Sequence, residues 1–293
     1  MKKRTQIYSP RQTMLAKDYE IFHYSDTSLG NVSLHHHDFY ECYYFISGDV
    51  TYMIEGKSYQ LMPGDIILIN SKELHQPIIQ NRELPYERIV IWLNKNFLNT
   101  LCTEQANLTR CFEDAKKENV IRTDVEAQQS IRAIMNKLLK LETYSGMGLE
   151  LLYRAYVTEL LILLNNLLFY NTARHNILFE KSSLIEEIID YINTHLEETI
   201  TIEDLSQQFY LSRFHLLREF KKYSGTTLHK FIVQKKLILS KELILQGIPI
   251  NQVYAQCGFG DYSNFFRAFK NEYGVTPKEF FQLMYHSEQS NSK

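Results

Sequence analysis

Residues 258–277 read GFGDYSNFFRAFKNEYGVTP, and the pattern of residue types in this region occurs twice in the chain. One copy runs Phe265-x-Arg267-x-Phe269-Lys270-x3-Gly274-x-Thr276-x3-Phe280. The other runs Leu216-x-Arg218-x-Phe220-Lys221-x3-Gly225-x-Thr227-x3-Phe231, 49 positions earlier. Agreement in both residue type and spacing over this length predicts two similar structural elements.

Each copy has the residue pattern of a helix-turn-helix unit. In the first, Thr201 caps one helix and Ser212 caps the next, which is expected over 213–222. In the second, Gly258 permits the positive φ of a tight turn, and Asp261 caps a helix over 262–273. Between the copies, the apolar period predicts one amphipathic helix over 229–246. If both units face one way, they enter successive major grooves, roughly 34 Å apart.

Basic charge is concentrated in the same region, although the whole chain has a net charge of −2. Residues 205–279 hold eleven Lys and Arg residues against five acidic ones, and the stretch before them is acidic. A local excess of positive charge is typical of a surface that contacts phosphates. The alternative is an ordinary solvated helical face, but the repeat, the caps and the charge coincide.

The region resembles the DNA-binding domain of AraC/XylS-type transcription regulators. The matching stretches are Leu205-Ser206-x5-Ser212-x3-Leu216-x-Arg218-x-Phe220-Lys221 and Gly258-Phe259-x-Asp261-x-Ser263-x-Phe265-x-Arg267-x-Phe269-Lys270-x3-Gly274-x-Thr276-Pro277. The resemblance covers 202–281 and implies a regulator, not an enzyme, that binds double-stranded DNA, with RNA polymerase as a further partner. The chain departs from the family with Ser206 and Tyr254 in place of Ala, Lys236 in place of Arg, and Leu228 in place of Pro.

The residues near the start of each second helix point at base edges in this geometry. Arginine pairs with guanine and asparagine with adenine, whereas apolar side chains pack on thymine methyl groups. Lys221, Lys222 and Lys270 are expected to contact phosphates. For Arg218 and Arg267 an ion pair within the domain is the competing role, and Phe265 and Phe269 are expected in the core. The predicted DNA-binding residues are Arg213, Phe214, Leu217, Arg218, Lys221, Tyr262, Ser263, Asn264, Phe266, Arg267 and Lys270.

The N-terminal region has a β pattern instead. From about 19 to 92, short runs of β-branched and aromatic residues such as 41–46 and 50–54 are separated by turn signals, among them Ser47-Gly48-Asp49 and Pro63-Gly64-Asp65. Many short strands at close intervals predict an antiparallel barrel or sandwich.

A histidine motif lies within this β region. It reads Gly30-x4-His35-His36-His37-Asp38-Phe39-Tyr40-Glu41-x6-Gly48 and is followed by His75. On one strand, His35, His37 and Glu41 would point to the same side of the pleat. The motif resembles the metal-binding motif of cupin barrels, although Gly30 and His35 are one residue closer than usual.

Three roles remain open for the motif. A divalent Fe, Mn, Ni or Zn ion suits the donor set of His35, His37, Glu41 and His75. This ion is the cofactor that the motif suggests. The same four residues, with Tyr43 and Trp92, can instead line a pocket for a small-molecule effector, or they only stabilise the barrel mouth. Tyr43, Phe45, Tyr52 and Trp92 form either an aromatic wall for a sugar ring or ordinary core.

The middle of the chain predicts a helical hairpin. Apolar residues recur at helical spacing over about 124–170, interrupted at 145–148. The predicted architecture is an α+β multidomain chain: a cupin-like ligand-sensing β-barrel over 1–120, a dimerising helical hairpin over 121–171, a linker over 172–182, and an all-α DNA-binding domain with two helix-turn-helix units over 183–286.

Several protein classes are excluded. The four cysteines form no CxxC pair and are too few for a disulfide framework, so a reducing cytoplasm is expected. No apolar segment follows the basic N-terminus, so no signal peptide is expected. The most apolar run, 149–170, contains Arg154 and Glu159, which favour a buried helix over a membrane span.

The function favoured by these patterns is a homodimeric, ligand-responsive transcription regulator. A carbohydrate is the favoured effector, by family analogy and from the aromatic residues. One alternative is a metal-dependent cupin enzyme with an attached regulatory domain. The other is a ligand-independent DNA binder whose barrel serves only for dimerisation.

Overall fold

The computed structural model describes residues 13–27, 29–30, 32–114, 117–169 and 184–283. The chain divides into two compact units, 1–179 and 180–293, and each has its own hydrophobic core. The expected linker at 172–182 and residues 284–286 of the expected DNA-binding domain lie outside the described residues.

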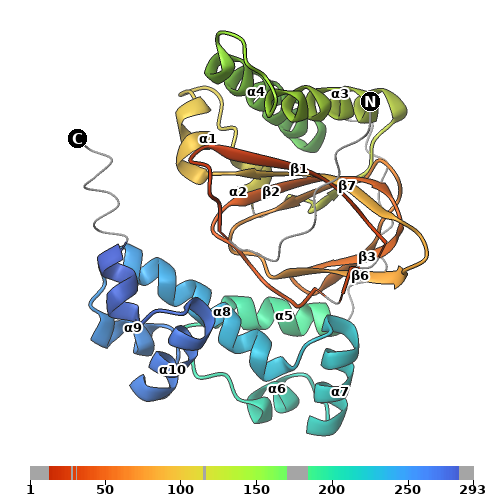
Figure 1. The fold of residues 1–293 in the computed structure, drawn as a ribbon. Coiled ribbons are helices and arrows are strands. Elements are labelled where there is room, and N and C mark those ends of the chain that lie inside the picture. The colour runs from red at the N-terminus through yellow and green to blue at the C-terminus, as the bar shows by residue number, and fades with distance from the viewer. Residues whose placement is uncertain (1–12, 28, 31, 115–116, 170–183, 284–293) are drawn as a thin grey trace. The chain divides into compact units, whose positions relative to one another are not determined.

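The first unit is built on two antiparallel sheets (Figure 1). The larger sheet has the strand order β1-β7-β2-β5-β8, and the smaller sheet has the order β4-β3-β6. In chain order the strands are β1 (Tyr19–Asp26), β2 (Tyr40–Ser47), β3 (Asp49–Ile54), β4 (Lys57–Gln60), β5 (Ile66–Ile69), β6 (His75–Asn81), β7 (Tyr86–Leu93) and β8 (Val120–Ile121).

Both faces of the larger sheet are buried. Successive side chains of a strand point to opposite faces, so Tyr43 and Phe45 of β2 join the core shared with the smaller sheet. Cys42 and Tyr44 join a second core on the opposite face. Residues 40–45 are therefore all buried, which explains why this stretch reads as a continuous apolar run.

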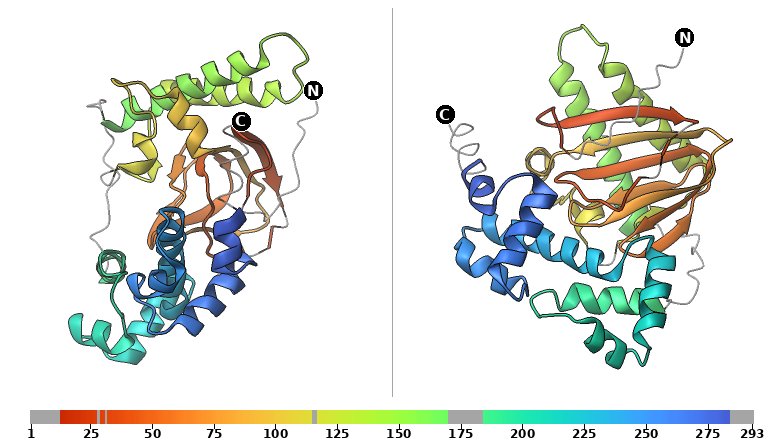
Figure 2. Two further views of the ribbon diagram at one scale, coloured as in Figure 1. Left: turned by 90° about the vertical axis from the view of Figure 1, so that its left-hand side faces the viewer. Right: turned by 60° about the horizontal axis from the view of Figure 1, so that its bottom comes forward.

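The predicted helical hairpin covers the outer face of the larger sheet (Figures 1 and 2). It consists of α3 (Val125–Leu141), which Asp124 caps, and α4 (Leu149–Phe169). By length and composition α4 could also cross a membrane. However, Leu160, Leu161 and Leu164 are fully buried in the cluster that includes the strands, so α4 is a core helix of this unit.

Two short helices lie after the predicted β region, within the part of the chain assigned to the barrel domain. These are α1 (Lys95–Leu101) and α2 (Arg110–Glu113). Asn94 caps α1 by accepting hydrogen bonds from two backbone N–H groups. Phe112 of α2 stacks on Tyr40 of β2 with ring centroids 4.7 Å apart. Both helices are too short to produce a periodic signal, so only their burial reveals them.

The second unit is entirely helical in its described residues, 184–283. Its helices are α5 (Leu184–Thr194), α6 (Ile202–Gln208), α7 (Arg213–Ser224), α8 (Leu228–Leu245), α9 (Ile250–Gln256) and α10 (Tyr262–Tyr273), followed by helical residues 277–283. The three predicted caps are confirmed, because the side chains of Thr201, Ser212 and Asp261 each accept a hydrogen bond from a backbone N–H of the first helical turn.

Helix α8 joins the two helix-turn-helix units and contributes to the core of each (Figure 2). Phe231 of α8 meets Phe220 of α7 with ring centroids 5.5 Å apart. Further along α8, Leu237 packs in one cluster with Phe265 and Phe269 of α10, which confirms that both phenylalanines are core residues.

Three of the eleven basic residues counted toward the positive surface are buried lysines of α8, so the predicted surface charge is too high. Lys235, Lys236 and Lys241 are each less than one-tenth exposed, so they do not belong to a surface that meets phosphates. Their aliphatic stems pack in the core, as long charged side chains commonly do. The other eight basic residues of the region are exposed.

Lys236 connects the two helix-turn-helix units. Its Nζ donates to the backbone oxygen of Glu198, before α6, at 2.7 Å and to that of Gly258, after α9, at 2.6 Å. Burial lowers the pKa of Lys236 below its usual value. Gly258 has the predicted positive φ of 64°, and a Cβ at this position would lie 2.1 Å from the Glu198 oxygen. This junction therefore has no room for a side chain at 258.

Candidate functional site

The turns of the two helix-turn-helix units differ in length. In the first, Tyr210 has a left-handed backbone with φ of 54°, and Ser212 caps α7 two residues later. In the second, Gly258 is the left-handed residue, and Asp261 caps α10 three residues later. The second turn is thus one residue longer, as the spacing around Gly258 indicates.

The arginines at the start of α7 make only exposed local contacts. Arg218 Nε donates to Glu219 at 3.1 Å, and Arg213 pairs with Glu203. Exposed ion pairs such as these contribute little to stability, so DNA phosphates or bases can replace the carboxylates. The predicted contacts in α7 are exposed apart from half-buried Leu217: Arg213, Phe214, Arg218 and Lys221.

In α10 the predicted adenine-reading amide is held in place by its neighbours. Arg267 Nη2 donates to Asn264 Oδ1 at 2.6 Å, and Asn264 Nδ2 donates to Asp261. Fixing the amide before DNA binds reduces the entropy lost on binding. The predicted contacts in α10 are exposed apart from half-buried Phe266: Tyr262, Ser263, Asn264, Arg267 and Lys270.

The first unit contains a largely enclosed cavity of about 40 Å³ between its sheets. This volume holds only a few water molecules. Phe45 lies in the core and does not line the cavity, so of its two predicted roles the structure favours ordinary core. The lining residues are Tyr24, Leu29, Val32, His35, His37, Glu41, Tyr43, Tyr52, Pro77, Tyr86, Arg88, Val90 and Trp92.

His35 and His37 do not lie on one strand with Glu41, contrary to the prediction. β2 begins only at Tyr40, because the backbone of His35 pairs with that of His75 at the start of β6. The cluster forms across the two sheets instead, with ligand atoms of His37, Glu41 and His75 within 4.8 Å of one another. His35 lies beside this cluster, its ring centroid 4.3 Å from that of His75.

The backbone fixes the imidazoles of the cluster. His37 Nδ1 lies 2.8 Å from the oxygen of Phe39, and His75 Nδ1 lies 2.9 Å from that of Glu73. Carbonyl oxygens only accept hydrogen bonds, so each Nδ1 carries a proton, and in the neutral form of either ring Nε2 has a lone pair. Both Nε2 atoms are buried without a hydrogen-bond partner among the described residues. They lie 3.5 and 3.6 Å from Oε2 of Glu41.

The electrostatics favour neutral imidazoles at His75 and His35 beside an ionised carboxylate. Burial lowers the pKa of His75 well below its usual value and also lowers the pKa of His35. Burial alone would raise the pKa of Glu41, but His37 and Trp92 outweigh it and hold that pKa below its usual value. Trp92 Nε1 donates to Glu41 Oε1 at 2.9 Å, which leaves Oε2 directed at the two histidines.

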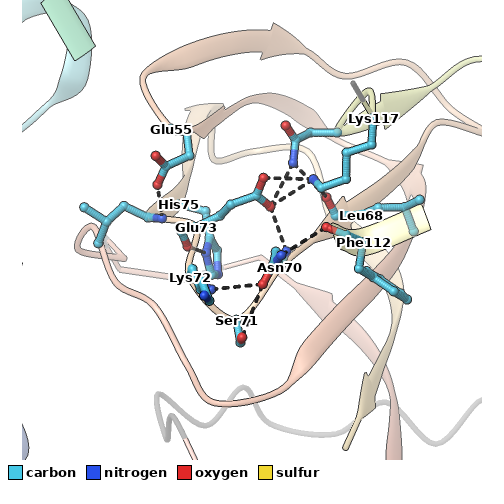
Figure 3. A network of polar contacts seen from close by, with 11 residues as sticks. Glu55, Leu68, Asn70, Ser71, Lys72, Glu73, His75, Phe112 and Lys117 are labelled. Carbon is cyan, nitrogen blue, oxygen red and sulfur yellow. Dashed lines mark hydrogen bonds and ion pairs between the residues drawn. The ribbon is translucent and has the colours of Figure 1, made fainter. Parts of the chain in front are cut away.

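A second network holds the loop that carries His75 (Figure 3). The carboxylate of Glu73 accepts hydrogen bonds from Lys117 Nζ at 2.8 Å and from the backbone N–H of Asn70 at 2.7 Å. Because the carbonyl of Glu73 also accepts from His75, these contacts tie the imidazole to Lys117, which is 44 residues from Glu73. No local sequence pattern points to Glu73 or Lys117.

Arg88 is a cavity residue that the sequence analysis missed. It is 2% exposed, forms an ion pair with Asp26, and lies over the rings of Tyr24 and Tyr86 at 4.8 and 4.1 Å. A single cation within the apolar strand 86–93 is the signal that could have identified it, because a buried charge needs partners.

Comparison with known proteins places both units in one family. A model described as a helix-turn-helix domain matches residues 205–282, and one described as the AraC-like ligand binding domain matches residues 20–186, more than half of the chain. The chain belongs to the AraC family. The predicted AraC-type resemblance is therefore confirmed, and the AraC-like ligand binding match contains every residue of the cavity.

Individual relatives have low sequence identity to this chain or match only part of it. The transcriptional activator RhaS of Salmonella paratyphi A is 21% identical over 85% of this chain and 87% of its own length. LumQ of Photobacterium leiognathi, named a probable transcriptional regulator, is 35% identical over 94 residues, which are 32% of this chain and 38% of LumQ. Among solved structures, Vibrio cholerae ToxT with a bound unsaturated fatty acid covers 91% of this chain and 95% of its own at 14% identity, with a TM-score of 0.39. The DNA-binding domain of AdpA in complex with target DNA covers 35% of this chain and 93% of its own at 20% identity, with a TM-score of 0.34.

Replacing exposed lysines of α7 and α10 is expected to change the salt dependence of DNA binding. Lys221→Ala and Lys270→Ala should each reduce the slope of log K against log salt by about 1, because each removes one phosphate contact. The slope is measured by fluorescence anisotropy, using a labelled duplex that the unaltered protein selects from a random pool. Lys140→Ala, an exposed lysine of α3, is the matched control and should leave the slope unchanged. Unaltered slopes for both test variants would contradict the assignment.

Proposed function

We propose that this AraC-family regulator binds a small molecule in the cavity of its first unit and thereby changes its affinity for DNA. The proposal rests on one observation: the domain matched as ligand-binding encloses a cavity with convergent polar groups. A ligand shifts DNA affinity only if it binds the DNA-competent and incompetent states differently. RNA polymerase is the further partner that regulation of transcription requires.

The chemistry of the cavity favours a small polar effector, with a carbohydrate as the first candidate. Tyr52 and Trp92 offer ring faces for stacking, while His35 and Arg88 offer hydrogen bonds. Drug-sized ligands occupy pockets of about 300 Å³ or more, so a sugar needs the cavity to expand from its present 40 Å³. The wall that includes Leu29 and Val32, between β1 and β2, is the part we expect to move.

A panel of monosaccharides and other small polar metabolites tests this proposal. One compound should change the affinity for the selected duplex by roughly 5- to 150-fold, the usual range of allosteric coupling. The effect should weaken in Trp92→Phe, which has a smaller ring and lacks the indole N–H that donates to Glu41. It should persist in Tyr59→Phe, which alters a core tyrosine outside the cavity lining. No response to any sugar would contradict the carbohydrate assignment. No response to any compound would favour the ligand-independent DNA binder.

We also infer that the cluster of His37, Glu41 and His75 holds a divalent metal ion. Two buried Nε2 atoms converge with a carboxylate oxygen, and each imidazole donates its other N–H to a backbone carbonyl, as metal-binding histidines commonly do. His35 is the candidate fourth ligand. Such a donor set suits Zn, Fe, Mn or Ni, and the bound ion would supply a Lewis acid to an effector oxygen.

Metal binding has a direct reporter in Trp92, the single tryptophan of the chain. Adding Zn²⁺, Ni²⁺ or Mn²⁺ to chelator-treated protein should change its fluorescence, because Glu41 accepts a hydrogen bond from its indole. His75→Ala should reduce affinity by at least tenfold, whereas His23→Ala, which alters a histidine paired with Glu87 outside the cluster, should not.

Elemental analysis of the purified chain complements this titration. Stoichiometric metal would keep the alternative of a metal-dependent enzyme open. Absence of metal together with silent fluorescence would eliminate both the metal site and that enzyme.

We propose that the hairpin forms a homodimer through α4. Leu151 is 74% exposed and Ile162 is 46% exposed. They lie about three helical turns apart and therefore on one side of the helix. A second copy of the chain would cover these two side chains and bring two DNA-binding domains to one operator.

Charged substitutions in α4 test dimerisation. Leu151→Glu and Ile162→Glu should convert the protein to monomers, because each places a charge in an apolar interface. Sedimentation velocity at micromolar concentration measures the change. Leu84→Glu, which alters an exposed leucine between β6 and β7, is the control that should remain dimeric. A dimer in all three variants would rule out the α4 interface.

A further inference from the structure

Tyr210 occupies a position at which glycine is the usual residue. It follows the C-cap of α6, and its backbone is left-handed. Its N–H donates to the oxygen of Gln207, and the N–H of Leu211 donates to that of Ser206 at 2.9 Å. This pair of hydrogen bonds closes a helix around a left-handed residue, where a Cβ crowds the neighbouring carbonyl. A tyrosine therefore makes the turn less stable than glycine would.

Packing within the described chain does not offset this cost. The side chain of Tyr210 is 96% exposed, so its ring gains almost nothing from burial. Strained residues persist mainly where function requires the side chain. The combination of strain and exposure indicates a role outside the fold of this unit.

The neighbours of Tyr210 indicate which role. Two residues later Ser212 caps α7, and the exposed Arg213 and Phe214 follow. In a helix-turn-helix unit this end of the second helix enters the major groove. The preceding turn then lies beside the sugar–phosphate backbone, which tyrosine hydroxyls commonly contact.

We propose that Tyr210 is a DNA-contacting residue, with its hydroxyl donating a hydrogen bond to a phosphate oxygen beside the first helix-turn-helix unit. This inference rests on the proposed DNA-binding faces of α7 and α10. Tyrosine suits the role because its side chain is rigid and loses little conformational entropy on binding.

The second helix-turn-helix unit cannot make the same contact. Gly258 is the equivalent left-handed residue, since the N–H groups of Gly258 and Phe259 repeat the hydrogen bonds made by Tyr210 and Leu211. A Cβ at 258 would clash with the oxygen of Glu198. The contact therefore belongs to the first helix-turn-helix unit alone and makes the two halves of the DNA site unequal.

The test compares stability with DNA affinity in the full-length protein. Tyr210→Gly relieves the backbone strain, so calorimetry should show the melting temperature of the helical unit rising by about 3 °C. The same variant should bind the selected duplex at least about tenfold more weakly, because a hydrogen bond to a charged group is lost. Tyr210→Phe, which removes only the hydroxyl, should lose most of this affinity without the gain in stability. The salt slope should stay unchanged in both, since tyrosine carries no charge.

Unchanged affinity in both variants overturns the inference, and so does a lower melting temperature in Tyr210→Gly. Unchanged affinity with impaired transcription would assign Tyr210 to a protein partner instead. Arg218→Ala and Arg267→Ala, footprinted on the same duplex, separate this failure from a wider one. If they weaken binding at different positions while the Tyr210 variants do not, only the Tyr210 inference fails. If they also have no effect, the proposed DNA-binding faces are wrong.

Discussion

Burial of both faces of the five-stranded sheet is the constraint on which the first unit depends. In β2, Tyr43 faces the cavity while Cys42 and Tyr44 face the helical hairpin, and the same alternation runs through β7. Each buried side chain contributes roughly 25 cal/mol per Å² of apolar area, and a close-packed layer resists independent movement of its two sides. A shift of Glu41 or Trp92 on the inner face is thus felt by the residues beneath α3 and α4. The sheet offers a physical route from the proposed effector site to the proposed dimer helix.

The histidine cluster is expensive to maintain and well supported. A buried nitrogen without a hydrogen-bond partner costs on the order of 1–3 kcal/mol, and the cluster contains two that have none within the described part of the chain. The fold nevertheless orients both rings through backbone carbonyls and holds Glu73 with Lys117 and Asn70. Support of this kind positions lone pairs for a ligand rather than filling space, which is why the cluster is the centre of the sensing proposal.

The second unit solves a different problem, which is to hold two recognition helices at one separation. Helix α8 packs against α7 near its start and against α9 and α10 further along. Lys236 adds a polar junction between the segment before α6 and the turn after α9. The two helix-turn-helix units are nevertheless unequal, because the turn of one carries the exposed Tyr210 and the turn of the other carries Gly258, which has no room for a side chain. A helical domain with two unequal helix-turn-helix units suits an asymmetric DNA site.

The sequence by itself determined the helical repeat, the caps at Thr201, Ser212 and Asp261, and the left-handed Gly258, because these depend on interactions between residues a few positions apart. It also identified all three members of the histidine cluster, though with the wrong geometry: His35 and His37 lie before β2, and the backbone of His35 pairs with that of His75. Only the tertiary structure showed that three lysines of α8 are buried, that Arg88 lines the cavity, and that Glu73 pairs with Lys117. Their partners lie tens of residues away in the chain or on other helices, so no local pattern encodes them, and burial and long-range contacts decide their roles.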